Sequence, residues 1–582
     1  MPPGSCHVVA VRNGASRRSV PNILFIMFDQ LRFDYLSCAF DDEPPARHTD
    51  LPLTTPNIDA LATKGVRFRN AYVQSPVCGA SRMSFYTGRY SSSHGAQWNN
   101  YPLKVGEQTI GDHLRKLGMS SWLVGKTHMK ADAEGMERLG LSPDSTIGAR
   151  VAECGFDIWA RDDGLWAQGP DGFYDSRRSP YNEYLKTKGY EGENPWHDFA
   201  NAGVGEDGDM ASGWFMKSAG EAANIDEQDS ETPWLTREVM AFIDSREGND
   251  EPWLCHASYI KPHWPYIVPA PYHDMYAGQV PPPVRDDAER DDPHPVYAQF
   301  MANRIGQAFQ RDEVREAVLP AYMGLIKQCD DQMGVLFDHL EKTGRMDDTM
   351  IVITADHGDY LGDHWLGEKD LFHAQSVKVP LIIYNPSAAA DNARSTTCDA
   401  LVESIDLAAT FVEFAGGEVP DHIIEGRSLM PFLHGREPDT WREIAVSEYD
   451  YSATDMAEKL GLAPRDARLF MVCDGRWKLM HAEGGDENGP FPPMLFDLKN
   501  DPEEFHDLGR SVDHAEVIVT MYEHLAKWSR RMSQRTTVSE DDIFARRGGS
   551  DSVGILIGVY DESEVAAENA ARYTGPAPKR PS

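Results

Sequence analysis

The chain has 582 residues, 41% of them hydrophobic and 25% charged, a composition typical of a globular protein and unlike that of disordered or fibrous chains. Its 56 Lys and Arg residues against 92 Asp and Glu residues give a formal net charge of −36, which disfavours binding to nucleic acids or anionic membranes. We find neither a long apolar run that could span a membrane nor a secretory signal, so we expect a cytoplasmic protein whose eight scattered cysteines stay reduced.

The first part of the chain alternates predicted strands and helices after a flexible leader at residues 1–20. The continuous apolar run Ile23–Phe28 is typical of a buried strand in a parallel sheet. The next predicted elements are a helix from Thr55 that ends at Gly65, a strand at Val66–Tyr72, a helix at Thr109–Leu117 and a strand at Ser121–Val124.

The middle of the chain contains two predicted insertions, at about 131–235 and 280–315, which we expect to shape a substrate pocket. Around them lie a predicted helix at Thr236–Ser245, a strand at Trp253–Tyr259, a helix at Ala321–Thr343 that starts after Pro320, and a strand at Met350–Thr354. This alternation predicts an α/β fold with a large, mostly parallel, mixed sheet sandwiched by helices.

The C-terminal part has a different pattern, which predicts a smaller antiparallel sheet. Its strand candidates are Ala445–Glu448, Leu469–Cys473, Trp477–His481 and Leu495–Asp497, followed by a helix at Ala515–Ser529. We therefore predict a catalytic domain at 21–440, an α+β subdomain at 441–530 and an extended tail at 531–582. The tail carries an apolar strand, Val553–Val559, which favours a role as the oligomerisation arm of a dimer or tetramer.

Two acidic segments directly follow predicted strands. Asp29-Gln30 follows Ile23–Phe28, and Asp356-His357 follows Met350–Thr354. An Asp in such a place is more often a turn former than a ligand. However, ligands of open parallel sheets bind beyond the carboxyl ends of the strands, and carboxylate, amide and imidazole groups suit a divalent cation. The two pairs together favour a metal site.

Cationic side chains follow further strands at the same predicted edge. Lys126 and His128 come after Ser121–Val124, His263 comes after Trp253–Tyr259, and Lys369 lies twelve residues after His357. Surface lysines and histidines usually have no special role. Gathered beside a metal, however, such groups could bind a tetrahedral oxyanion and supply a general acid.

The segment Cys78-Gly79-Ala80-Ser81-Arg82 places a cysteine where a loop meets a helix. Thiolates are favoured at helix N-termini and near cations, although a lone cysteine is more often part of the core. Together with Gly125–His128, Asp356–Gly358, Leu495–Leu498 and Asp501–Glu503, this motif makes the chain resemble the sulfatase family of the alkaline-phosphatase-like superfamily over about 21–510. The segments Ser81–Gly95, Pro262-His263 and Ile555–Gly558 resemble the branch of phosphonate monoester hydrolases and related arylsulfatases.

The resemblance implies that a maturation enzyme oxidises Cys78 to formylglycine. One hydroxyl of the hydrated aldehyde would attack sulfur or phosphorus, and loss of a proton from the second hydroxyl would let the covalent ester collapse back to aldehyde. Arg82 would hold the hydrate. One divalent ion, Ca²⁺ or Mn²⁺, would be bound by Asp29, Gln30, Asp356, His357 and the modified Cys78.

The same resemblance implies roles for the cationic residues. Lys126 and Lys369 would bind substrate oxygens, and His263 would donate a proton to the leaving oxygen and contact the substrate. His128 would position the hydrate, and Asn99 would contact the substrate.

Two positions depart from the usual family pattern. Ala80 stands where the maturation motif usually has Pro, and Gln30 stands where many sulfatases have a second Asp. The neutral Gln30 makes the metal site less negative by one charge, which shifts its preference from Ca²⁺ toward Mn²⁺ or similar ions without deciding between them.

Three functions remain open from the sequence. The first is hydrolysis of small sulfate monoesters, chiefly aryl sulfates, with side activity on phosphonate monoesters and phosphodiesters. The second has phosphonate monoesters or phosphodiesters as the main substrates. The third is an unmodified relative that only binds oxyanions, which Ala80 permits.

Overall fold

The computed structural model describes residues 21–40, 51–164, 179–205, 207–532 and 537–546. The chain divides into two compact units, one made of Met1–Val419 with Ile424–Met532 and the other of Pro420–Ile423 with Ser533–Ser582. All the elements discussed below belong to the first unit. The predicted leader at 1–20 and the apolar segment Val553–Val559 lie outside the described residues, so the proposed oligomerisation arm stays a prediction.

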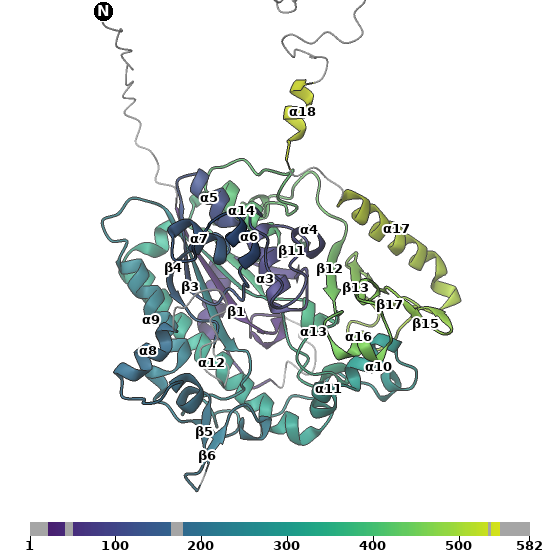
Figure 1. Cartoon of the computed structure of the whole chain (residues 1–582), viewed down its shortest axis with the longest axis horizontal. Coiled ribbons are helices and arrows are strands. Elements are labelled where there is room, and N and C mark those ends of the chain that lie inside the picture. Colours follow the sequence, from purple (N-terminus) through teal and green to yellow (C-terminus); the bar gives the residue numbers. More distant parts are fainter. Residues whose placement is uncertain (1–20, 41–50, 165–178, 206, 533–536, 547–582) are drawn as a thin grey trace, which may run out of the picture. The chain divides into compact units, whose positions relative to one another are not determined.

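In the described part of the first unit, eight strands form a large sheet (Figure 1). Their order is β11 (Thr396–Glu403), β2 (Val66–Tyr72), β10 (Leu381–Tyr384), β9 (Thr349–Ala355), β1 (Asn22–Asp29), β8 (Trp253–Pro262), β3 (Ser120–Gly125) and β4 (Asp157–Arg161). Neighbouring strands run parallel, except that β10 is antiparallel to both β9 and β2. The predicted mostly parallel, mixed sheet is therefore confirmed.

The central strands explain the apolar runs of the sequence. Every residue of β1, β8 and β9 is buried, because a parallel strand in the middle of the sheet is covered by helices on both faces. On one side α2 (Pro56–Lys64), α9 (Glu231–Asp244) and α12 (Asp312–Lys342) pack together, and α3 (Cys78–Thr87), α5 (Ile110–Lys116) and α14 (Asp406–Phe414) form a second layer.

Several elements differ from the sequence predictions. Helix α12 begins at Asp312 and carries Pro320 in its interior, so the predicted start after Pro320 is wrong. Pro320 removes one helical hydrogen bond, but the additional turns bury Val314 and Val318, which offsets that loss.

The range 131–235 is not only a cover over the sheet, because it supplies strand β4, which pairs with β3. It also holds α6 (Ala133–Arg138), α7 (Thr146–Ala152), α8 (Pro180–Thr187) and a small sheet of β5 (Ala202–Val204), β6 (Met210–Ser212) and β7 (Ala222–Ala223). Strands β4, β10 and β11 have no counterpart in the sequence predictions. Both β4 and β11 are edge strands that are only partly buried, so they lack the apolar runs of the central strands.

The predicted C-terminal sheet is present. Its strands are β12 (Ala445–Asp450), β13 (Arg468–Cys473), β14 (Trp477–Ala482) and β17 (Met494–Asp497), in that order and all antiparallel. Helix α17 (Ala515–Arg531) packs Met521, Leu525 and Trp528 into a cluster with Val472 and Leu479 of the sheet. The boundaries 21–440 and 441–530 themselves stay a prediction.

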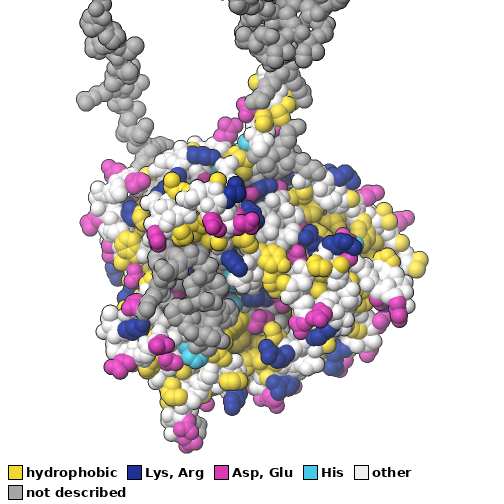
Figure 2. All heavy atoms as spheres, in the orientation of Figure 1, with side chains coloured by type: hydrophobic (Ala, Val, Ile, Leu, Met, Phe, Trp, Pro, Cys, Tyr) yellow, Lys and Arg dark blue, Asp and Glu magenta, His cyan; other side chains and the backbone are white. Residues whose placement is uncertain are grey.

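The surface carries charged side chains of both signs. On the face shown in Figure 2, acidic and basic side chains are interspersed. Within the described ranges, none of the helices has the length and apolar character needed to cross a bilayer. No disulfide joins the cysteines of these ranges.

Candidate active site

Four neighbouring strands bring the predicted site residues to one edge of the sheet. The order β9-β1-β8-β3 places the residues that end or follow these strands side by side, namely Asp356, Asp29, His263 and Lys126. The register pairs Phe28 with Ala355, so Asp29 and Asp356 are adjacent. The backbone N–H groups of Gln30 and His357 both donate to Asp356 Oδ1 at 3.0 Å, which fixes that carboxylate.

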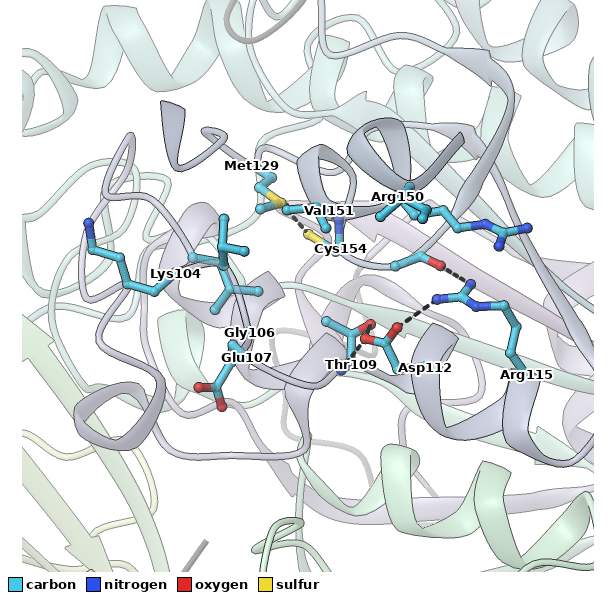
Figure 3. Close-up of a pocket in the computed structure, with 14 residues that line it drawn as sticks. Lys104, Gly106, Glu107, Thr109, Asp112, Arg115, Met129, Arg150, Val151 and Cys154 are labelled. Atoms are coloured by element: carbon cyan, nitrogen blue, oxygen red, sulfur yellow. Dashed lines mark hydrogen bonds and ion pairs between the residues drawn. The ribbon is translucent and has the colours of Figure 1, made fainter. Parts of the chain in front are cut away.

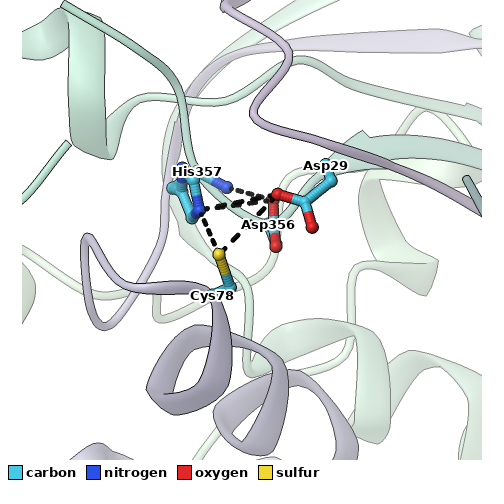
Figure 4. A group of neighbouring side chains, drawn as sticks. All are labelled: Asp29, Cys78, Asp356 and His357. Atoms are coloured by element: carbon cyan, nitrogen blue, oxygen red, sulfur yellow. Dashed lines mark hydrogen bonds and ion pairs between the residues drawn. The ribbon is translucent and has the colours of Figure 1, made fainter. Parts of the chain in front are cut away.

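Four of these side chains form a compact, buried group of possible metal ligands (Figure 4). Ligand atoms of Asp29, Cys78, Asp356 and His357 all lie within 4.8 Å of one another. Cys78 Sγ is 3.0 Å from His357 Nε2 and 3.7 Å from Asp29 Oδ1. His357 Nδ1 lies 2.8 Å from the Gly358 carbonyl oxygen and therefore donates to it, which leaves the Nε2 lone pair facing the group. This donor set fits a divalent metal ion.

Gln30 is held beside the same group. Its amide nitrogen donates to Asp359 Oδ2 and lies 3.4 Å from the Tyr266 hydroxyl. Its amide oxygen is 3.3 Å from Lys369 Nζ, and that ammonium group is 3.1 Å from Cys78 Sγ. Because the amide nitrogen makes these two contacts, the amide oxygen of Gln30 points toward Lys369 and Cys78.

Two buried cations neutralise the carboxylates. Arg82 binds Asp356 Oδ2 at 2.8 Å and Asp29 Oδ2 at 3.2 Å, and it donates to Ser258 Oγ at 2.7 Å. Lys126 pairs with Asp29. Burial would raise the pKa of Asp29, but Lys126, His263 and Arg82 together hold it well below the usual value. The guanidinium of Arg82 is thus anchored on the carboxylates that flank Cys78.

Cys78 is the first residue of α3 and is fully buried. Burial, together with the charge of Asp29, raises the pKa of its thiol to about 12. The unmodified side chain is therefore a neutral thiol near pH 7.

His263 and Lys369 form a hydrogen-bonded pair next to the cysteine. His263 Nδ1 donates to the Trp264 carbonyl oxygen at 2.7 Å, and its Nε2 lies 3.2 Å from Lys369 Nζ. Burial lowers the pKa of His263 well below its usual value, and Lys369 adds to that effect. Burial opposes protonation of Lys369, but Cys78, Glu368 and Asp29 raise its pKa. The resting pair is a neutral imidazole that accepts from an ammonium group.

The last two predicted residues also lie at the site. His128 Nδ1 is buried and has no hydrogen-bond partner among the described residues. Burial and Lys126 lower the pKa of His128 well below its usual value. Asn99 Oδ1 accepts from the backbone N–H of Gly79 at 2.8 Å. A Cβ atom on Gly79 would lie only 2.9 Å from that oxygen, which explains why glycine follows the cysteine.

A cavity of about 430 Å³, here called the active-site cavity, opens over these groups. Its lining includes the predicted residues Asn99, Lys126, His128, His263 and Lys369. It also includes residues that sequence reasoning missed: Trp98, Trp196, Trp214, Trp264, Glu368 and Asp370. Glu368 and Asp370 flank Lys369 and could have been noticed for that reason. The tryptophans come from segments far apart in the chain, so no local sequence pattern identifies them.

A second cavity, of about 200 Å³, shares the lining residue Met129 with the active-site cavity (Figure 3). Its two arginines are already engaged. Arg150 makes two hydrogen bonds to Asp157, at 2.7 and 2.8 Å, and Arg115 binds Asp112 at 2.7 Å. These internal pairs account for the charges of both arginines without a ligand.

Glu289, His364 and His373 form another group of possible ligands. The two imidazole rings stack with centroids 3.8 Å apart and an interplanar angle of 7°. The lone pairs of parallel rings do not converge on one point between them, whereas a metal ion about 2 Å from each nitrogen requires such convergence. This group is better explained as a buried stack anchored by the contact of His364 Nδ1 with Glu289 at 2.6 Å.

The chain is similar in sequence to known protein families and to individual proteins. The sulfatase family model matches residues 21–417, and a model for the C-terminal region of N-sulphoglucosamine sulphohydrolase matches residues 362–531. The chain is 29% identical to the multifunctional alkaline phosphatase superfamily protein PehA of Trinickia caryophylli, over 88% of this chain and 96% of PehA. It is 27% identical to an arylsulfatase of Clostridium perfringens, over 86% and 92% of the two chains.

Among solved structures, the phosphonate monoester hydrolase SpPMH from Silicibacter pomeroyi superposes with a TM-score of 0.75 at 28% identity. That match covers 89% of this chain and 96% of SpPMH. Since the first family model spans well over half of the sequence, the chain belongs to the sulfatase family, a family of sulfuric ester hydrolases, as its motifs predicted.

Proposed function

We propose that this protein hydrolyses sulfate monoesters, chiefly aryl sulfates, with a formylglycine derived from Cys78 as the nucleophile. The observation that carries the proposal is the position of Cys78 Sγ, which lies within 3.7 Å of Asp29, His357 and Lys369 in a fully buried group.

Asp29, Gln30, Asp356 and His357 would hold one divalent ion, Ca²⁺ or Mn²⁺. When bound, such an ion supplies positive charge and lowers the pKa of a coordinated hydroxyl group. His357 is oriented for this role by its bond to the Gly358 carbonyl, and Arg82 would limit the repulsion between Asp29 and Asp356.

Lys126 and Lys369 would bind the oxygens of the ester group. Both ammonium groups are buried, where a hydrogen bond to developing negative charge is worth more than in water. The contact of 3.1 Å between Lys369 Nζ and Cys78 Sγ supports this role, because a substrate held by the nucleophile would meet the same ammonium group.

His263 would protonate the leaving oxygen from Nε2. The resting imidazole is neutral at this atom, since Nδ1 carries the proton that is donated to the Trp264 carbonyl. Binding of an anionic ester would raise the proton affinity of Nε2, so that this atom would carry a proton in the complex. His128 and Asn99, which line the cavity, would position the hydrate and the substrate.

A second candidate function is hydrolysis of phosphonate monoesters or phosphodiesters. The likeness to the solved phosphonate monoester hydrolase, at 28% identity, favours it, and these esters share with sulfate monoesters a singly charged tetrahedral centre. We expect the protein to have this as a side activity. An inactive, oxyanion-binding relative is the third alternative, which Ala80 permits.

Two measurements test these alternatives. Intact-mass analysis of the tryptic peptide that contains Cys78, with hydrazide capture of the aldehyde, distinguishes formylglycine from a free thiol. We then expect a higher kcat/KM for 4-nitrophenyl sulfate than for 4-nitrophenyl phenylphosphonate. A clear phosphonate preference would support the second candidate, and a free thiol in a fully active preparation would exclude the proposed nucleophile.

The remaining predictions concern partners and location. We expect the maturation enzyme to act on the Cys78 motif and the protein to be cytoplasmic. We also expect it to assemble as a homo-oligomer, and size-exclusion chromatography with light scattering tests that oligomeric state.

A further inference from the structure

The ring of His263, the proposed proton donor, is oriented by the backbone of the next residue. Its Nδ1 donates to the Trp264 carbonyl oxygen at 2.7 Å. In a neutral imidazole the hydrogen bond of one nitrogen decides which nitrogen carries the proton. The Trp264 carbonyl therefore keeps the proton on Nδ1 and turns the Nε2 lone pair toward Lys369. Any group that holds this carbonyl in place controls the atom that would meet the leaving oxygen.

A buried lysine lies against the same stretch of backbone, residues 263–265, here called the His263 turn. Lys261 is the penultimate residue of β8 and is only 5% exposed. Its Nζ donates to the Pro265 carbonyl oxygen at 2.9 Å and lies 3.5 Å from the His263 carbonyl oxygen. These two carbonyls flank that of Trp264. Because peptide groups are planar, an ammonium group that holds both flanking carbonyls restricts rotation of the peptide group between them.

The same ammonium group connects the His263 turn to the segment that supplies Trp196. Lys261 Nζ lies 3.4 Å from Asn201 Oδ1. Asn201 in turn donates to the Trp196 carbonyl oxygen, through its backbone N–H at 3.0 Å and through Nδ2 at 3.1 Å. Trp196 and Trp264 both line the active-site cavity. Lys261 thus links two parts of the cavity wall that are far apart in the sequence.

The surroundings of Lys261 indicate a role in geometry more than in fold stability. Within the described part of the chain, its three hydrogen-bond acceptors are neutral oxygens. Burial lowers the pKa of Lys261, and the charge of Glu231 opposes that effect without cancelling it. Burying a charge is costly unless it is paired, and an apolar side chain of similar length would fill the same space at a lower cost. The contacts of the ammonium group with the His263 turn are therefore its most informative feature.

We propose that Lys261 is a positioning residue, which holds the His263 turn so that Nε2 of His263 faces the leaving oxygen. The inference rests on the proposed function, because it takes His263 as the proton donor. The described residues that line the cavity do not include Lys261, so it acts through the turn and not on the substrate. Its loss therefore affects most strongly the esters whose leaving group needs a proton.

The test compares phenyl sulfate, which has a poor leaving group, with 4-nitrophenyl sulfate, which has a good one, on the fully matured, metal-loaded protein. Lys261→Met removes the donor and keeps the length of the side chain. In this variant kcat/KM should fall roughly fivefold more for phenyl sulfate than for 4-nitrophenyl sulfate. The control is Lys327→Met, at a half-buried lysine of α12 that pairs with Asp331, which should change both esters by the same factor.

A double-mutant cycle separates positioning of His263 from a general loosening of the site. In the His263→Ala background, Lys261→Met should change the ratio of the two esters by less than about twofold, because the group that it positions is already absent. Equal losses of the two esters in Lys261→Met, or the full fivefold change of the ratio in the double variant, would overturn the inference.

The position of the imidazole proton provides a measurement that needs no turnover. NMR of the histidine ring nitrogens should show the Nδ1–H tautomer for His263 in the wild type, assigned by loss of its signals in His263→Ala. In Lys261→Met both tautomers should be populated. An unchanged tautomer in this variant would refute the inference, and a proton on Nε2 of the resting wild type would do so even if the variant did not fold.

This measurement also keeps the inference separate from the proposed function. If the wild type hydrolysed neither ester but Lys261→Met still changed the tautomer, Lys261 would retain its positioning role and the proposed function would be wrong. If the wild type hydrolysed both esters while the tautomer and the ester ratio stayed unchanged in Lys261→Met, the proposed function would stand and the role of Lys261 would be refuted.

Discussion

The edge of the sheet that carries the proposed metal ligands Asp29 and Asp356, here called the ligand edge, and the wall of the active-site cavity are built in opposite ways. The ligand edge uses residues at the ends of β1 and β9, strands in fixed parallel register whose every residue is buried. The wall uses Trp98, Trp196, Trp214 and Trp264, which come from separate connecting segments. The first arrangement fixes the reaction, whereas the second can change with little effect on the sheet. Under the proposed function, chemistry and specificity would therefore be set by different levels of the structure.

The largest effect should come from the ligand edge. Cys78→Ala should lower kcat/KM for 4-nitrophenyl sulfate roughly 10⁴-fold or more, as expected for loss of a nucleophile, with little change in Tm. The control is Cys398→Ala, a half-buried cysteine of β11, which should keep activity within about twofold. If Cys78→Ala retained most of the activity, the nucleophile would have to be another group.

Lys369 joins the two regions, because it contacts Cys78 and lines the cavity. Lys369→Ala should reduce kcat/KM about 100-fold, by loss of a donor to the developing negative charge. Steady-state kinetics with 4-nitrophenyl sulfate measures this. Lys64→Ala is the control, since Lys64 is exposed and paired with Glu341. If Lys369→Ala lowered kcat/KM no more than Lys64→Ala does, the assigned role of Lys369 would be contradicted.

His263 should show its role through the leaving group. His263→Ala should reduce turnover of phenyl sulfate roughly tenfold more than that of 4-nitrophenyl sulfate, because a poor leaving group needs a proton in the transition state. The comparison requires kcat/KM of both esters in wild type and variant. Equal losses on the two esters would assign His263 a positioning role instead of that of an acid.

The smallest effect concerns stability away from the ligand edge. Glu448 of β12 is buried and accepts the backbone N–H of Ser92 at 3.0 Å, and burial raises its pKa to about 7. The folded state then binds this proton more tightly than the unfolded state. The stabilisation from protonated Glu448 is complete below about pH 4.5 and is lost as the pH rises through about 7. The free energy of unfolding changes by up to ~3 kcal/mol over this range.

Denaturant unfolding at pH 5 and pH 8 measures that contribution. Glu448→Gln keeps the hydrogen-bond acceptor and should reduce the fall in the free energy of unfolding between the two pH values. Glu516→Gln, at an exposed position of α17, is the control and should leave that fall unchanged. An identical fall in wild type and Glu448→Gln would show that Glu448 has an ordinary pKa.

The sequence predicted the central architecture because buried strands leave long apolar runs. Ile23–Phe28 and Met350–Thr354 lie within β1 and β9 as predicted, and the C-terminal strands match with small extensions. Strands β4 and β11 were missed, since edge strands are only partly buried and lack that signal. Strand β10 is fully buried but has only four residues, so its apolar run is too short to stand out. The start of α12 was misplaced because a proline, usually a helix boundary, is tolerated where the surrounding turns are packed.

The sequence identified the residues that can do chemistry, because most of them, and the Cys78 motif, directly follow or begin a recognisable element; Lys369 is an exception. Tertiary structure alone decided their contacts: Arg82 binds the two carboxylates, Lys369 links Cys78 to His263, and Gln30 is oriented by Asp359. The tertiary structure also brings together the tryptophans that line the cavity. The physical reason is that local pattern fixes the face and the end of an element, whereas the crossing of distant segments fixes which side chains meet.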